Sequence, residues 1–272
     1  MPSLLSNRLA KRVLKPAFAL VEQRLERATT ALQSDLDALH HEVADLRRQS
    51  YGLGLLLDRA GRDGDRMPTA TQVDALVREV GAVTGERGER VRHDITVAYR
   101  HLVALEALGA GGLGGSVSDV CGRLAAVPLL APPNGEVLEI GTRHGLFAAA
   151  LRRMLQRGGL DARLTVVDPL DGAPAREDVV RGNLALGGGR PADDAARLVR
   201  GSFAEACVRD AVADRRYGVI VVDGDGHDLA AVRELAAPGA VVVTAVGGPP
   251  RPAGLTGLGR VADSVYCRAA EA

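Results

Sequence analysis

Aromatic residues are scarce in this 272-residue chain, at 3%, and tryptophan is absent. Hydrophobic residues still make up 46% of the sequence. The core must therefore be built mainly from alanine, valine and leucine. The length suits one medium α/β domain with an accessory segment.

An excess of charge of either sign is also missing, because 34 Lys and Arg balance 34 Asp and Glu. A nucleic-acid-binding face needs surplus basic residues to displace counterions, so we expect no nucleic-acid partner. The three cysteines, Cys121, Cys207 and Cys267, are scattered without a CxxC pair. This argues against a disulfide framework and a zinc site, and favours a reducing compartment.

Long apolar runs are absent as well, since none reaches the ~18 residues that a transmembrane helix needs. The N-terminus is basic, but acidic and basic residues interrupt the apolar stretch that follows, unlike in a signal peptide. We expect a cytoplasmic protein with no transmembrane segment.

Residues 1–60 form the first of three zones and carry a seven-residue repeat of apolar positions. Its members are Phe18, Leu25, Leu32, Leu39, Leu46 and Leu53, with Leu36 and Val43 at the other seam position and Thr29 weakening it. Such heptads are typical of a coiled-coil helix, which predicts a homodimer through this segment. An amphipathic helix packed on its own domain is the alternative.

The other two zones differ in their patterns. Residues 61–133 read as a polar linker followed by helices over 71–83, 90–108 and 117–130, with the glycine-rich break GAGGLGG at 109–115. Residues 134–272 alternate short strands with helices, and the tail from 257 to 269 offers one or two final strands. This alternation predicts a Rossmann-like, doubly wound, mainly parallel α/β sheet.

The first predicted strand runs into a glycine turn, in the sequence EVLEIGTRHG at 136–145. Gly141 and Gly145 allow the backbone to approach a ligand and to adopt positive φ. Their spacing is not G-x-G-x-x-G, which disfavours a dinucleotide site. Glu139 suits a cation such as the ammonium group of an amino acid.

The second and fourth predicted strands also end in acids. Asp168 follows the second strand and is placed to accept ribose hydroxyls; a solvated strand end is the alternative. Asp223, Asp225 and His227 follow the fourth strand, in VIVVDGDGHD. We assign them as candidate catalytic residues, with His227 as a possible general base. Asp228 offers a further carboxylate for a divalent cation, or a helix cap; we expect no resident metal.

Together the stretches VLEIGTRHG, LTVVDPL and YGVIVVDGDGH resemble class I S-adenosylmethionine-dependent methyltransferases, in the group with EIGT and DGDH signatures. GSVSDVCGRLAAV (115–127), DVVRGNLALGG (178–188) and SVYCRAA (264–270) resemble an actinobacterial branch of that group. The resemblance implies S-adenosyl-L-methionine as cofactor. It places Glu139, Gly141, Thr142 and Gly145 at the methionine end, Asp168 at the ribose, and Ser202 and Phe203 beside the adenine.

The sequence also departs from this family. A glycine interrupts DGDH, the following helix looks short, and VTAVG at 243–247 has no acid where relatives tend to carry one after strand five. The leading hypothesis is O-methylation of a small or carbohydrate-like hydroxyl acceptor. The alternative is a degenerate methyltransferase fold that serves as a scaffold through its coiled coil. A nicotinamide-dependent oxidoreductase is disfavoured, because lysine occurs only at Lys11 and Lys15 and no Tyr-xxx-Lys is present.

Overall fold

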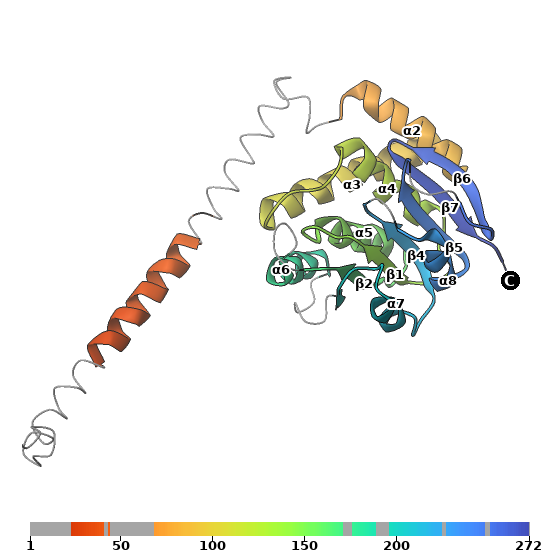
Figure 1. Ribbon diagram of the computed structural model, residues 1–272. Coiled ribbons are helices and arrows are strands. Elements are labelled where there is room, and N and C mark those ends of the chain that lie inside the picture. Colours follow the sequence, from red (N-terminus) through yellow and green to blue (C-terminus); the bar gives the residue numbers. More distant parts are fainter. Residues whose placement is uncertain are drawn as a thin grey trace, which may run out of the picture. The chain divides into compact units, whose positions relative to one another are not determined.

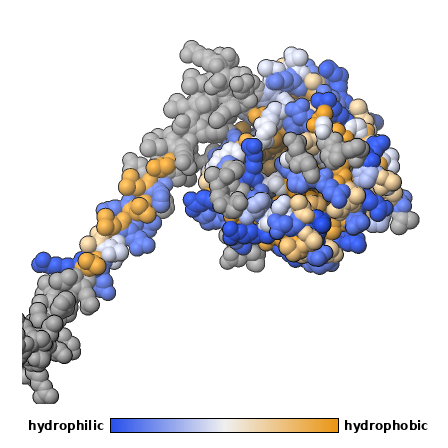
Figure 2. Space-filling model, in the orientation of Figure 1, coloured by the Kyte–Doolittle hydropathy of each residue, from blue (hydrophilic) through white to orange (hydrophobic). Residues whose placement is uncertain are grey.

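The computed structural model describes residues 23–40, 43, 68–170, 176–188, 196–224, 227–247 and 251–271. The chain divides into two compact units, Met1–Gly54 and Leu55–Ala272. In the first unit residues 23–40 are helical, and apolar side chains follow one side of this helix (Figure 2). The exposed members are Leu25, Leu32, Leu36, Leu39 and Val43. Phe18, Leu46 and Leu53 of the predicted heptad lie outside the described residues, as does the predicted linker at 61–65.

The second unit is built on a seven-stranded sheet with the order β3-β2-β1-β4-β5-β7-β6 (Figure 1). The strands are β1 (Glu136–Ile140), β2 (Arg163–Asp168), β3 (Arg197–Arg200), β4 (Tyr217–Val222), β5 (Ala236–Ala245), β6 (Leu255–Val261) and β7 (Ser264–Ala269). The first five are parallel, whereas β7 runs antiparallel to both β5 and β6. The predicted Rossmann-like sheet is thereby confirmed, including the two final strands.

Helices cover both faces of this sheet (Figure 1). They are α2 (Ala70–Thr84), α3 (Gly88–Leu108), α4 (Val117–Leu129), α5 (Leu146–Arg157), α6 (Glu177–Gly188), α7 (Ala206–Val212) and α8 (Leu229–Leu235). One apolar cluster packs the five helices from α2 through α6 against one face of the sheet. A second cluster packs α7 and α8 against the other face. Alternation along β1 divides its side chains between them, with Val137 in the first cluster and Leu138 and Ile140 in the second.

The carboxyl ends of parallel strands lie at the same edge of the sheet. β1 pairs with β2 on one side and β4 on the other, so the ends of these three strands are neighbours. In open α/β sheets ligands bind at this edge. Among the described residues, no helix is long and apolar enough to cross a membrane.

Two glycines of α6 provide a test of how closely α5 and α6 pack. A Cβ at Gly187 would lie 2.7 Å from Cα of Ala149, whereas a Cβ at Gly182 would meet nothing within 4 Å. We expect Gly187→Ala to lower the free energy of unfolding by about 1–3 kcal/mol through overpacking. Gly182→Ala should raise it by about 0.5–1 kcal/mol, because alanine favours helix. Urea unfolding measures both, and equal effects of the two changes would contradict the close contact.

Candidate active site

The turn that follows β1 is shaped by glycines in the left-handed region. Gly141 has φ 81° and Gly145, the N-cap of α5, has φ 77°. A Cβ at Gly141 would lie 2.6 Å from the carbonyl oxygen of Asp223, and the backbone amide of Asp223 donates to Ile140 O at 2.8 Å. The turn therefore lies directly against the end of β4, and only glycine fits at position 141.

Glu139 lies beneath this turn and is 1% exposed. Its Oε2 accepts a hydrogen bond from the hydroxyl of Thr142 at 2.5 Å, while the buried Oε1 has no hydrogen-bond partner. Burial raises the pKa of Glu139 to about 8, and the neighbouring carboxylates of Asp223 and Asp168 contribute. A buried acid with one free oxygen is suited to a cationic donor from a ligand.

Asp168, at the end of β2, is 8% exposed, so it is not a solvated strand end. Its Oδ2 accepts from the backbone amide of Thr142 at 2.9 Å, and its Oδ1 accepts from the amide of Leu170 at 3.1 Å. The carboxylate thus holds the glycine turn in place. Each oxygen keeps a second lone pair that a ribose hydroxyl could use.

The described residues after β4 do not all line the same cavity. Asp223 lines a cavity, whereas His227 is not among that cavity's lining residues. His227 instead contacts the Asp223 carbonyl through Nε2 at 3.2 Å and packs edge-on against Phe203, with ring centroids 6.4 Å apart. Asp225 lies outside the described residues. Asp228 caps α8 by accepting from the Ala230 amide, which is the structural alternative considered for it.

Ser202 and Phe203 lie between β3 and α7. Phe203 is only 2% exposed and belongs to the apolar cluster beneath the sheet edge, so it offers a ligand little surface. The amide of Ser202 donates to Oε1 of Glu205 at 3.0 Å. The carboxylate of Glu205 therefore lies beside the backbone of Ser202.

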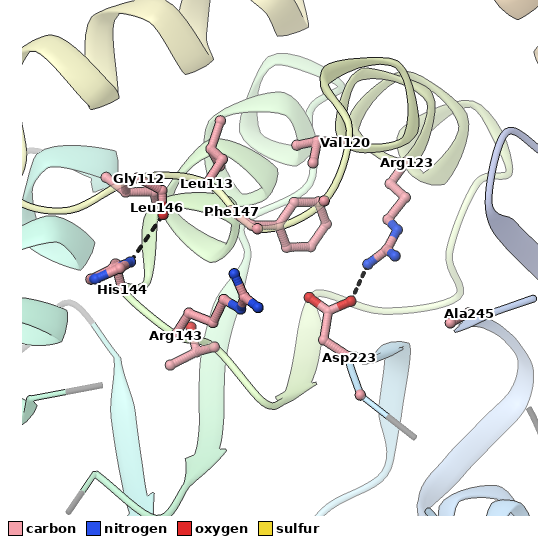
Figure 3. Close-up of a pocket in the computed structure, with 14 residues that line it drawn as sticks. Gly112, Leu113, Val120, Arg123, Arg143, His144, Leu146, Phe147, Asp223 and Ala245 are labelled. Carbon is pink, nitrogen blue, oxygen red and sulfur yellow. Dashed lines mark hydrogen bonds and ion pairs between the residues drawn. The ribbon is translucent and has the colours of Figure 1, made fainter. Parts of the chain in front are cut away.

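The cavity has a volume of about 230 Å³ and lies between the glycine turn, α4 and the ends of β4 and β5. Figure 3 shows three cationic or ionisable side chains around it, Arg123, Arg143 and His144, together with Asp223. The apolar part of the wall is Leu113, Val120, Leu146, Phe147 and Ala245. Sequence reasoning identified Asp223 and Thr142 among the lining residues but missed the arginines, which lie in segments that it read as helix and turn.

Arg123 is the centre of a buried polar network. Its guanidinium donates to Asp223 Oδ1, to Asp119 Oδ2 at 2.8 Å, and through Nε to Ser264 Oγ at 2.6 Å; the Ser264 hydroxyl donates to Asp119. Burial opposes the charge on Arg123, but the carboxylates of Asp223 and Asp119 raise its pKa. Its guanidinium also lies 5.8 Å from the centroid of the Phe147 ring.

The glycine-rich segment at 109–115, expected to be a flexible break, is tied to the site by Asn183 of α6. The Asn183 amide donates to the carbonyls of Ala110 and His144, and its Oδ1 accepts from the Ala110 amide. His144 Nδ1 lies 2.9 Å from Gly112 O. This segment therefore forms a fixed wall of the cavity.

A metal site finds little support in the donor set. Within the part of the chain that the structure describes, no group of three His, Cys, Asp or Glu residues could hold an ion. Ala245, at the end of β5, lines the cavity without offering an acid, and one oxygen of Asp223 is taken by Arg123.

Glu139→Gln tests the buried acid. Because burial raises the folded-state pKa of Glu139 from 4.5 to about 8, the folded protein binds this proton more tightly than the unfolded chain does. The wild type should therefore lose stability as the pH rises from about 4.5 to about 8, and level off above. We expect the variant to lose several kcal/mol less over that window, measured by urea unfolding, because each unit of raised pKa corresponds to about 1.4 kcal/mol. Parallel pH profiles for the two proteins would contradict the raised pKa.

No curated protein sequence matches the chain. Among solved structures, an S-adenosylhomocysteine-bound methyltransferase of Podospora anserina has a TM-score of 0.45 at 15% identity, covering 65% of this chain and 88% of its own. CalS11, a TDP-rhamnose 3'-O-methyltransferase of calicheamicin biosynthesis, has a TM-score of 0.38 at 18% identity. The match covers 74% of this chain and 96% of the CalS11 chain. A CmcI structure with Mg and S-adenosylmethionine has a TM-score of 0.35 at 16% identity. The match covers 52% of this chain and 59% of the CmcI chain.

A family model gives the most direct match, because it covers the site itself. Residues 138–244 match the family described as "Methyltransferase domain". This segment runs from β1 to β5 and contains Glu139, the glycine turn, Asp168 and Asp223. The part of the chain that builds the carboxyl edge of the sheet is therefore similar in sequence to methyltransferase domains.

Proposed function

We propose that the chain is an S-adenosylmethionine-dependent methyltransferase that methylates a hydroxyl oxygen of a small or carbohydrate-like acceptor. The observation that carries the proposal is the unpartnered, buried Oε1 of Glu139 beside a glycine turn. The match of residues 138–244 to methyltransferase domains supports it. Membership of the EIGT/DGDH group, and of its actinobacterial branch, remains part of this proposal.

The residues present fit the ammonium group and the ribose of the cofactor. Glu139 would accept from the ammonium group of the methionine moiety, and Gly141 leaves the backbone open for close approach. Asp168 would accept from the ribose hydroxyls with the lone pairs that the backbone amides leave free. Ser202 would border the adenine, and Phe203, which is 2% exposed, would support this wall from within the apolar cluster. When bound, the cofactor supplies a methyl group on a sulfonium, and sulfur keeps the electrons of the breaking bond.

The chain's own contribution to transfer is alignment and removal of one proton. Asp223 is fixed by Arg123 through Oδ1, and its Oδ2 accepts no hydrogen bond from the described residues. This oxygen is the candidate acceptor for the hydroxyl proton. His227 contacts the Asp223 backbone and Phe203, so we place it on the adenine side of Asp223.

A scaffold without turnover is the second candidate. The absence of an acid at Ala245 favours it, as does α8, which has only seven residues. Binding of S-adenosylhomocysteine, combined with no methyl transfer across a broad panel of hydroxyl acceptors, would support the scaffold over the enzyme.

Titration calorimetry with S-adenosylhomocysteine tests the cofactor site. We expect micromolar binding near pH 7 and release of up to about one proton, because the ligand's ammonium lowers the raised pKa of Glu139. Comparing two buffers of different ionisation enthalpy measures the release. Glu139→Gln should abolish it and weaken binding, whereas Glu136→Gln, at the far end of β1, should change neither. Proton release that persists in Glu139→Gln would assign it to another group.

We further propose that the N-terminal helix forms a parallel homodimer. Five apolar residues at heptad spacing are 43–69% exposed, and soluble monomers rarely expose an apolar stripe of this length. Pairing with a second copy would bury both stripes. Thr29, at a seam position, donates to Leu25 O and should loosen the pairing locally.

Light scattering of the full-length protein measures this association. We expect a dimer for the wild type and a monomer for Leu32→Glu, which places a charge in the seam. Ser34→Glu adds the same charge off the stripe and should remain dimeric. A monomeric wild type at tens of micromolar would refute the homodimer.

A further inference from the structure

Arg143 is a cationic side chain at the cavity without an ion-pair partner among the described residues. Figure 3 shows its guanidinium directed into the cavity, toward Phe147 and Asp223. Arg123, by contrast, is fully engaged by Asp119, Asp223 and Ser264. The charge that the cavity can offer to a ligand is therefore that of Arg143.

The backbone at Arg143 indicates that its side chain matters. Arg143 has φ 55°, in the left-handed region that non-glycine residues rarely adopt. Glycine occupies this region at no steric cost and already stands at two other positions of the same turn, Gly141 and Gly145. An arginine at position 143 is disfavoured by its backbone conformation, which motivates the search for a role of its side chain.

The facing loop makes room for this side chain. A Cβ at Gly114 would lie 2.8 Å from Cδ and 3.1 Å from Nε of Arg143. A Cβ at Gly111 would lie 2.3 Å from the ring of His144. The glycines of the 109–115 segment therefore let Arg143 and His144 pass close to its backbone, and Asn183 and His144 hold this segment in register.

We propose that Arg143 binds a carboxylate or phosphate group of the methyl acceptor, so that the site selects anionic acceptors. This rests on the proposed function, because it assumes that the acceptor enters this cavity. The guanidinium presents a planar set of donors that matches either group. Arg143 is exposed, and the apolar side chains of Phe147 and Leu146 line the cavity beside it. The acceptor hydroxyl would then lie toward Asp223.

Matched probes of one skeleton test the proposal on the protein saturated with S-adenosylhomocysteine. Calorimetry compares 4-hydroxybenzoate with 4-hydroxybenzamide, and glycerol 3-phosphate with glycerol. We expect the wild type to bind at least one anionic member about tenfold or more tightly than its neutral counterpart. Arg143→Gln should remove this preference and Arg143→Lys should retain part of it. Arg78→Gln, an equal loss of charge on the exposed side of α2, should leave it unchanged.

Three results would overturn the proposal. The first is no preference for either anion in the wild type, including no binding by any probe. The second is an anion preference that survives Arg143→Gln. The third is an Arg143→Gln variant that binds S-adenosylhomocysteine more weakly but binds 5'-methylthioadenosine, which lacks the amino-acid carboxylate, as well as the wild type does. That result would assign Arg143 to the cofactor's own carboxylate. Failure of the wild type to bind S-adenosylhomocysteine at all would instead refute the proposed function.

Discussion

The buried guanidinium of Arg123 is the interaction on which the arrangement of the site depends. A charge in this position is tolerated only when it is paired and hydrogen-bonded, and each of its three nitrogens has a partner. Those partners come from α4, from the loop after β4 and from β7. One side chain thereby fixes the helix that covers the cavity against two strands of the sheet. Removing either carboxylate would leave one nitrogen of this buried guanidinium without its hydrogen-bond partner.

This network also sets the electrostatics of the carboxyl edge. Glu139, Asp168 and Asp223 converge there because three adjacent parallel strands end together. Three ionised carboxylates so close would repel one another. The structure reduces the repulsion in different ways: Asp223 is paired with Arg123, Asp168 accepts two backbone amides, and burial raises the pKa of Glu139. Of these three acids, only Glu139 has a fully buried oxygen without a hydrogen-bond partner, which makes it the point where a cationic ligand gains most.

Much of the fold could be predicted from the sequence, because buried parallel strands carry a strong local signal. The strands expected between 257 and 269 are present as β6 and β7, and the helices expected over 71–83, 90–108 and 117–130 match α2, α3 and α4 to within two residues. β5 is longer than its apolar run suggests, since it begins at Ala236. Pro238 and Gly239 suggest a loop there, but the strand continues across an irregularity opposite Tyr217 and Val219. Such pairing is a tertiary effect that local patterns do not encode.

The candidate site was predictable only where residues follow strands. Glu139, Asp168 and Asp223 were identified because a strand end fixes their place. Arg123 and Asn183 come from helices, and their roles depend on which distant backbone each helix meets. Both lie in the stretches at 115–127 and 178–188 that carried the family resemblance, and Ser264 lies in the third such stretch. That resemblance singled out the segments without revealing that Asp119, Arg123 and Ser264 meet in one network.

The same network explains how this cavity differs from a site built around carboxylates. Ala245 contributes no acid after β5, and Arg123 occupies one oxygen of Asp223. A divalent cation needs several oxygen ligands, and among the described residues of this cavity only Asp223 offers a carboxylate. Arg143 then supplies positive charge at the opposite wall, from a side chain instead of from an ion. An acceptor with its own negative charge would be oriented by this arginine, and its hydroxyl would need only one free carboxylate oxygen to receive the proton.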